Sequence, residues 1–149
     1  MNLLVKRIEK LHCRWNVSAL TAEDLYKLCS DHDIEVLEVP IRIDGFYYSV
    51  MGRHFIAVNS SLEPRRKLFV LFHEFAHFMF HAPTGLPSAR FHGIGRRCRK
   101  EREADMFALC ALIPRPMLES RSAADLIDEE GFPESMVLDR SELFKTHSI

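Results

Sequence analysis

Two histidines four residues apart, with a glutamate directly after the first, are the residues of this chain best suited to chemistry: residues 73–77 read His-Glu-Phe-Ala-His. On an α-helix, residues four apart lie on one face, a turn from each other. His73 and His77 can therefore direct their imidazoles at a single metal ion. Glu74 flanks that face, where it cannot easily be a ligand but can reach a water molecule bound to the metal. The spacing predicts a hydrolytic metal centre with Glu74 as the general base.

The segment around this motif is apolar and reads as a buried helix. Between residues 68 and 80, only the two histidines and the glutamate are polar. Burying those three side chains without partners would be costly, and a metal ion is such a partner. Pro64 suits the first position of a helix and Pro83 ends the pattern, although Ser60 and Glu63 have the spacing of a capping box and leave an earlier start open. The resulting helix is hydrophobic all round, which is typical of a central helix, and is too short to span a membrane.

The next helical pattern, residues 101–112, supplies a third ligand. At about 100° per residue, Glu101 shares a face with small residues that would let this helix approach the motif helix closely. We therefore expect His73, His77 and Glu101 to form a His₂Glu site whose fourth position is open for water.

Two other carboxylates of this pattern are assigned different roles. Asp105 lies one turn after Glu101 on the same face, where it could accept a hydrogen bond from a ligand histidine and fix its tautomer. An ordinary ion pair with Arg102, or an interaction with the helix dipole, is the alternative for Asp105. Glu103 falls on the opposite side of the helix and is expected to be solvated.

Several side chains are candidates for stabilising an oxyanion, and the sequence does not choose among Tyr47, Tyr48, His54 and His92. His81 stands two turns after His73. We expect it to cap the C-terminus of the motif helix, and a place beside the metal site is the alternative.

The two motifs together resemble those of ImmA/IrrE-type metallopeptidases. Residues 66–81 are similar to the motif helix of that family, and residues 101–108, Glu-Arg-Glu-Ala-Asp-Met-Phe-Ala, followed by Leu-Ile-Pro at 112–114, are similar to its second signature. The residues at 56–59 also fit. The resemblance implies a small gluzincin-like fold and a cytoplasmic zinc peptidase. Members of the family are typically paired with a helix-turn-helix repressor, which they cleave or inactivate to release stress or mobile-element genes.

Length and composition agree with one metallopeptidase domain over residues 1–149. The chain has 149 residues, of which 47% are hydrophobic, enough to bury a core. Its formal net charge of −1 argues against a molecule built for nucleic acid or for an anionic membrane. The N-terminus has no signal-peptide pattern. The cysteines form no CxxC pair and read as reduced thiols of a cytoplasmic protein: Cys13, Cys29, Cys98 and Cys110.

Hydrophobic periodicity predicts an α+β fold: a small zincin-like domain in which a short, mainly antiparallel sheet packs on the central HExxH helix. Thr21 is expected to cap a helix, and Gly52 to form the tight turn of a hairpin. Beyond the metal motifs, the expected helices are 3–15, 21–30, 122–130 and 133–145, and the expected strands are 34–39, 46–50 and 55–59.

Residues 82–100 join the two metal-bearing helices and are rich in glycine, proline and arginine. We expect a mobile, solvated basic loop. A lid, or a basic rim that selects an acidic substrate segment, is the alternative. A second hypothesis concerns substrate binding: strand 55–59, if it lies at the edge of the sheet, could pair with an extended peptide.

The sequence therefore predicts a zinc-dependent endopeptidase that acts on a protein substrate, with manganese as the alternative metal. A regulator that keeps the metal site but acts by binding a repressor without hydrolysis is the first alternative. A DNA-binding module that uses the N-terminal helices and the arginine cluster is the second; the near-neutral charge makes direct binding to nucleic acid a weak expectation.

Overall fold

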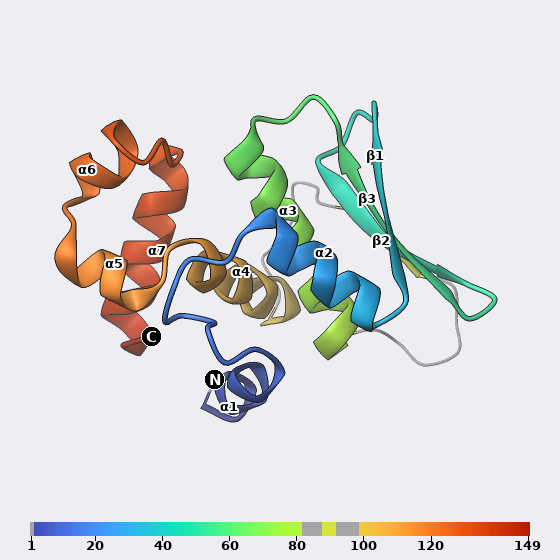
Figure 1. Cartoon of the computed structure of the whole chain (residues 1–149), viewed down its shortest axis with the longest axis horizontal. Helices are drawn as coiled ribbons and strands as arrows, with labels where there is room; N and C mark the ends of the chain where they lie inside the picture. The colour runs from blue at the N-terminus through green and yellow to red at the C-terminus, as the bar shows by residue number, and fades with distance from the viewer. Residues whose placement is uncertain (1, 82–87, 92–98) are drawn as a thin grey trace. The chain divides into compact units, whose positions relative to one another are not determined.

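The computed structural model describes residues 2–81, 88–91 and 99–149 (Figure 1). It is a mixed α+β structure, as the sequence predicted. The elements are, in chain order, α1 (Asn2–Leu11), α2 (Ala22–Asp31), β1 (Ile34–Val39), β2 (Gly45–Val50), β3 (Arg53–Asn59), α3 (Pro64–Ala76), η1 (His77–His81), β4 (Ser88–Phe91), α4 (Arg99–Leu112), α5 (Arg115–Ser120), α6 (Ala123–Asp128) and α7 (Glu134–His147).

The chain divides into two compact units. The first combines residues 1–20 with 105–149, and the second is residues 21–104. The second unit holds the sheet, α2, α3, η1 and the first turns of α4. That the whole chain acts as one metallopeptidase domain stays a prediction.

The sheet of the second unit has the strand order β1-β3-β2-β4. β2 pairs with β3 and with β4 in antiparallel fashion, whereas β1 pairs with β3 in parallel. The sheet is therefore mainly antiparallel, as predicted. β3 hydrogen-bonds to a strand on each side, so the hypothesis that residues 55–59 form an edge for a substrate peptide is wrong.

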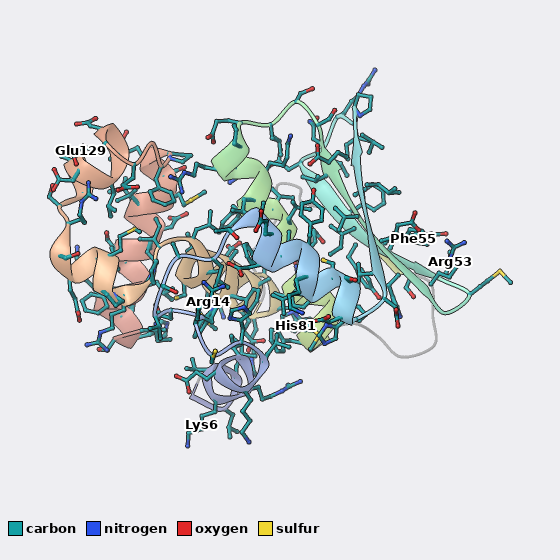
Figure 2. All side chains as sticks on the ribbon, viewed as in Figure 1. Lys6, Arg14, Arg53, Phe55, His81 and Glu129 are labelled. Carbon is teal, nitrogen blue, oxygen red and sulfur yellow. The ribbon has the colours of Figure 1, made fainter. Side chains whose placement is uncertain are left out.

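The hairpin between β2 and β3 turns at Met51 and Gly52, both with positive φ (50° and 76°), as the glycine predicted. Just beyond this turn, the Arg53 guanidinium lies 5.2 Å above the Phe55 ring (Figure 2). At the other end of β2, the backbone of Gly45 passes close to α3. A Cβ atom at Gly45 would lie 2.6 Å from Cγ1 of Val70 and 2.7 Å from the carbonyl oxygen of Ala57.

Two helices cover one side of this sheet (Figure 1): α2 contacts β1, and α3 contacts both β2 and β3. Thr21 caps α2 through a reciprocal capping box with Asp24, as expected. α3 begins at Pro64, and the Glu63 carboxylate accepts hydrogen bonds from the backbone N–H groups of Arg65 and Arg66. The start at Pro64 is thus confirmed over the earlier alternative.

The motif helix does not stay α-helical to its end. The α-helical pattern stops at Ala76, and η1 is a single π-helical turn. Such turns are rare and add one residue to a turn of helix. The sequence predicted an uninterrupted α-helix here.

The first unit is helical where the structure describes it. Leu4 and Ile8, one turn apart on α1, are buried, and so is Trp15, whose indole N–H donates a hydrogen bond to the carbonyl of Phe107 (2.9 Å). Arg140 is fully buried on α7. No helix among the described residues is long and apolar enough to cross a membrane.

Three other expectations need correction. α1 ends at Leu11 rather than at residue 15, and the turns that follow contain Asn16 in the left-handed conformation (φ 59°). α5 was not predicted. The expected loop 82–100 contains strand β4 and the first residues of α4, while its other residues, 82–87 and 92–98, lie outside the described part of the chain.

Candidate metal centre

α3 and the turn that follows it place the motif side chains in the interior. His73 and His77 are each 1% exposed, and Glu74 is 0% exposed. The neighbouring apolar residues of α3, which include Phe72 and Phe75, are also buried. Taking one carboxyl and two imidazoles out of water is unfavourable unless the protein or an ion compensates.

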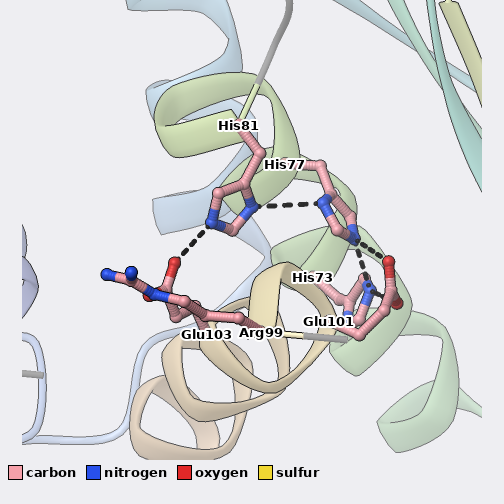
Figure 3. A network of polar contacts seen from close by, with 6 residues as sticks. All are labelled: His73, His77, His81, Arg99, Glu101 and Glu103. Carbon is pink, nitrogen blue, oxygen red and sulfur yellow. Dashed lines mark hydrogen bonds and ion pairs between the residues drawn. The ribbon is translucent and has the colours of Figure 1, made fainter. Parts of the chain in front are cut away.

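The third residue comes from the first turn of α4, where Glu101 directs its carboxylate at both histidines (Figure 3). The Nε2 atom of His73 lies 3.2 Å from Oε2 of Glu101, and Nε2 of His77 lies 3.0 Å from Oε1. The two Nε2 atoms are 2.9 Å apart. Glu101 thus lies beside the two histidines, as the sequence predicted. Its role as a metal ligand stays a prediction.

These three distances test whether the residues fit a metal ion. Zinc ligands lie about 2.0–2.2 Å from the ion, so two ligands of a tetrahedral site are about 3.4 Å apart. The observed separations of 2.9–3.2 Å are close to that value, and only small movements are needed to admit an ion. Nitrogen and carboxylate donors together suit zinc, and they also accept manganese. The residues fit a divalent metal.

A second histidine pair extends the cluster away from Glu101. Nδ1 of His81 lies 3.2 Å from Nδ1 of His77, and Nε2 of His81 lies 2.7 Å from Oε2 of Glu103 (Figure 3). The Arg99 guanidinium donates a hydrogen bond to the other carboxylate oxygen of Glu103, also at 2.7 Å. The alternative position for His81, beside the site, is therefore the one observed.

The surroundings of Glu103 contradict the expectation of a solvated side chain. Only 12% of the side chain is exposed. Burial acts to raise the pKa of this carboxyl, but the hydrogen bonds from His81 and Arg99 outweigh it and lower the pKa. Glu103 is therefore ionised at neutral pH.

The comparisons with known proteins agree with this geometry. The model of the Peptidase M78 family, described as the IrrE N-terminal-like domain, matches residues 29–137. The chain belongs to this family. No curated protein and no solved structure gave a significant match.

The match to the IrrE N-terminal-like family spans both metal-bearing segments, from α3 to the first turn of α4. The resemblance inferred from the two sequence motifs is thereby confirmed. Membership supports a metallopeptidase-like domain, and the three converging side chains give that domain a place for a metal: His73, His77 and Glu101.

Three of the four candidates for stabilising an oxyanion lie on the sheet, at Tyr47, Tyr48 and His54. Tyr47 and Tyr48 are neighbours on β2, so their side chains point to opposite faces of the sheet. Tyr47 is buried, its ring contacts Phe78 of η1, and its hydroxyl lies 2.9 Å from Nδ1 of His54. Tyr48 packs against Phe55. Neither assignment as an oxyanion stabiliser is tested.

Two other predicted residues are also left as predictions. His92 lies outside the described residues. Asp105 is half-buried on α4 and is the first residue of that helix to belong to the first unit. Its proposed hydrogen bond to a ligand histidine stays a prediction.

The sequence did not predict that Glu103 would contact His81 beside the candidate metal centre. A helical wheel for α4 alone compares residues of one helix, and it cannot show a partner on another element. Two signals were available: His81 repeats the four-residue spacing of His73 and His77, and Arg99 stands four residues before Glu103, the spacing of a helical ion pair.

Proposed function

We propose that this protein is a zinc-dependent endopeptidase whose metal is held by His73, His77 and Glu101. The observation that carries the proposal is the convergence of these donor atoms, all within 4.8 Å of one another. They come from two helices of a chain in a peptidase family. Manganese is the alternative ion.

Each residue has a distinct role in the proposed reaction. The zinc ion, when bound, would acidify a water molecule and polarise the scissile carbonyl. Glu74 follows His73 directly in the chain and is fully buried. We assign Glu74 as the group that takes a proton from the attacking water and passes it to the leaving amine. Asp105 is proposed to orient a ligand histidine.

The proposed substrate is a protein, and more narrowly a helix-turn-helix transcriptional repressor whose cleavage derepresses stress or mobile-element genes in the cytoplasm. This narrower proposal rests on the resemblance of the two sequence motifs to ImmA/IrrE-type peptidases. A repressor encoded beside this protein is the first substrate to try.

The test compares wild type with Glu74→Gln in a cleavage assay on that repressor, followed by mass spectrometry of the products. Glutamine keeps the size of the side chain but cannot act as a base. We expect the variant to retain about one metal ion per chain and to lose at least about 100-fold in rate. Glu9→Gln, on the exposed face of α1, is the matched control and should cleave as wild type does.

Unchanged cleavage by Glu74→Gln would contradict the assigned role of Glu74. No cleavage by wild type, together with repressor binding that Glu74→Gln leaves intact, would instead favour the regulator that acts without hydrolysis. Salt-sensitive binding of the protein to DNA would favour the DNA-binding alternative.

A further inference from the structure

The cluster beside the candidate metal centre contains more residues than three ligands and a base require. His81 and Glu103 both have little exposed side chain, 4% and 12%. Neither belongs to the three donors that converge on one point. Their contacts lead from the helix that carries Glu101, through His81, to the ring of His77 (Figure 3).

We call this chain of contacts, from Glu103 through His81 to His77, the relay. Its first step is the contact between Glu103 and His81. One oxygen of Glu103 accepts a hydrogen bond from the Arg99 guanidinium at 2.7 Å, and a carboxylate paired with a guanidinium accepts hydrogen bonds but does not donate one. With Oε2 of Glu103 2.7 Å from Nε2 of His81, the imidazole must carry a hydrogen on Nε2 and donate it. We take His81 as neutral, because a doubly protonated ring would also donate from Nδ1, and His77 would then carry its hydrogen on Nε2 and could not bind a metal there. The neutral imidazole with hydrogen on Nε2 has a lone pair on Nδ1.

The second step follows from the first. Nδ1 of His81 faces Nδ1 of His77 at 3.2 Å, so one of the two atoms must donate. Because the lone pair is on His81, the hydrogen is on Nδ1 of His77. That leaves the lone pair of His77 on Nε2, the atom that faces His73 and Glu101. Only this tautomer of His77 can act as a ligand there.

The contact between the two rings lies in the π-helical turn at the end of the motif helix. His77 and His81 are the first and last residues of the π-helical turn η1, and their ring centroids are 5.3 Å apart. Single π-helical turns within helices are found frequently at functional sites. Arg99, one turn before Glu103 on α4, holds the other oxygen of the carboxylate.

We infer that His81 is a positioning residue for the metal ligand His77, and that Glu103 acts through it by fixing the tautomer of both rings. The inference rests on the proposed function, because it assumes that His77 binds a metal. Carboxylates that orient ligand histidines usually contact them directly. In this chain a second imidazole stands between the carboxylate and the ligand.

The experiment measures zinc affinity of the full chain by competition with a chromophoric chelator, without a substrate. His81→Leu keeps a similar volume but removes the acceptor of His77. We expect its zinc dissociation constant to rise about 10- to 100-fold. His81→Asn places an amide oxygen near the position of Nδ1, and it should recover most of the loss.

A double-mutant comparison separates a relay from general damage. Glu103→Gln alone should weaken zinc binding, because an amide holds the tautomer of His81 less firmly than a carboxylate. The same change made in His81→Leu should have no further effect, since Glu103 acts only through His81. His147→Leu, an exposed histidine at the end of α7, is the matched control and should bind as wild type does.

The outcomes distinguish this inference from the proposed function. Zinc binding by wild type with unchanged affinity in both His81 variants would overturn the relay and leave the proposed ligands standing. Additive losses for His81→Leu and Glu103→Gln would also overturn it. No zinc binding by wild type would overturn the ligand assignment itself. If His81→Leu does not fold, judged by circular dichroism, His81→Asn and Glu103→Gln decide: the relay requires weaker binding in Glu103→Gln and near-wild-type binding in His81→Asn.

Discussion

Nε2 of His73 and Nε2 of His77 lie 2.9 Å apart, one helical turn from each other and both facing Glu101. Two imidazole nitrogens that meet at this distance need a proton or a cation between them, because their lone pairs repel. The Glu101 carboxylate faces both nitrogen atoms, and its negative charge favours a divalent cation over a proton at this position. This contact is the most direct structural reason to expect a metal.

Metal should therefore stabilise the folded chain. A ligand that binds only the folded state at about 100 times its dissociation constant adds roughly 2.7 kcal/mol to the free energy of unfolding. We expect the unfolding temperature of wild type, measured by calorimetry, to rise when zinc is added to chelator-treated protein. His77→Ala and Glu101→Ala should lose this rise, whereas His147→Ala should keep it. A zinc-dependent rise that persists in both ligand variants would place the metal elsewhere.

Gly45 should tolerate no larger residue, because its backbone approaches α3 closely. In Gly45→Ala the new Cβ would lie 2.7 Å from a backbone oxygen, which cannot move as freely as a side chain. We expect the free energy of unfolding to fall by about 1–3 kcal/mol in urea titrations. Gly52→Asn is the matched control: Gly52 has open space around it, and asparagine tolerates positive φ. Equal stability of the two variants would contradict the predicted clash.

The first unit should depend on Arg140. Its guanidinium donates hydrogen bonds to the carbonyls of Ile113 (2.7 Å) and Ile149 (2.8 Å) and to the side-chain oxygen of Asn16 (3.1 Å). Burial lowers the pKa of this group, and it is charged at neutral pH all the same. Arg140→Met would leave buried acceptors without these donors, at a cost of about 3 kcal/mol in the free energy of unfolding.

Lys145→Met, on the exposed side of the same helix, is the control for Arg140→Met and should change stability by less than about 0.5 kcal/mol. A loss of the same size in both variants would mean that the hydrogen bonds of Arg140 contribute little.

Thiol reactivity should follow burial. Burial raises the pKa of the Cys29 and Cys110 thiols to about 12, so that at pH 8 only about one in ten thousand is a thiolate, the reactive form. Cys13 is exposed. In a Cys98→Ser chain we expect a chromogenic disulfide reagent to label one thiol rapidly in the native state and three after unfolding. Rapid labelling of more than one native thiol would show that the buried cysteines open to solvent.

Local patterns were sufficient to predict those parts of the fold that neighbouring residues determine. Thr21 predicted the start of α2, Gly52 predicted the hairpin, and Pro64 predicted the start of the motif helix. The approach of Glu101 to the histidines was also predicted, because the small residues on its face of α4 identify the side that packs closely.

The remainder depends on contacts that leave little local signal. The parallel pairing of β1 with β3 has no turn of its own to mark it. β4 is only four residues long and lies in a stretch rich in glycine, proline and arginine. The burial of Glu103 depends on His81, which belongs to another element. His81 ends the π-helical turn η1, and a helical wheel, which assumes regular α-helical periodicity, does not represent such a turn.

That π-helical turn makes the centre sensitive to chain length as well as to residue type. Deleting one residue between His77 and His81 would let the α-helix continue, and the two rings would then be three residues apart and offset by about 60° around the helix axis, which changes the geometry of their contact. The HExxH motif would be intact. An alignment that scored only its five letters would therefore overlook the change, and spacing to His81 is the additional criterion by which chains sharing this arrangement can be recognised.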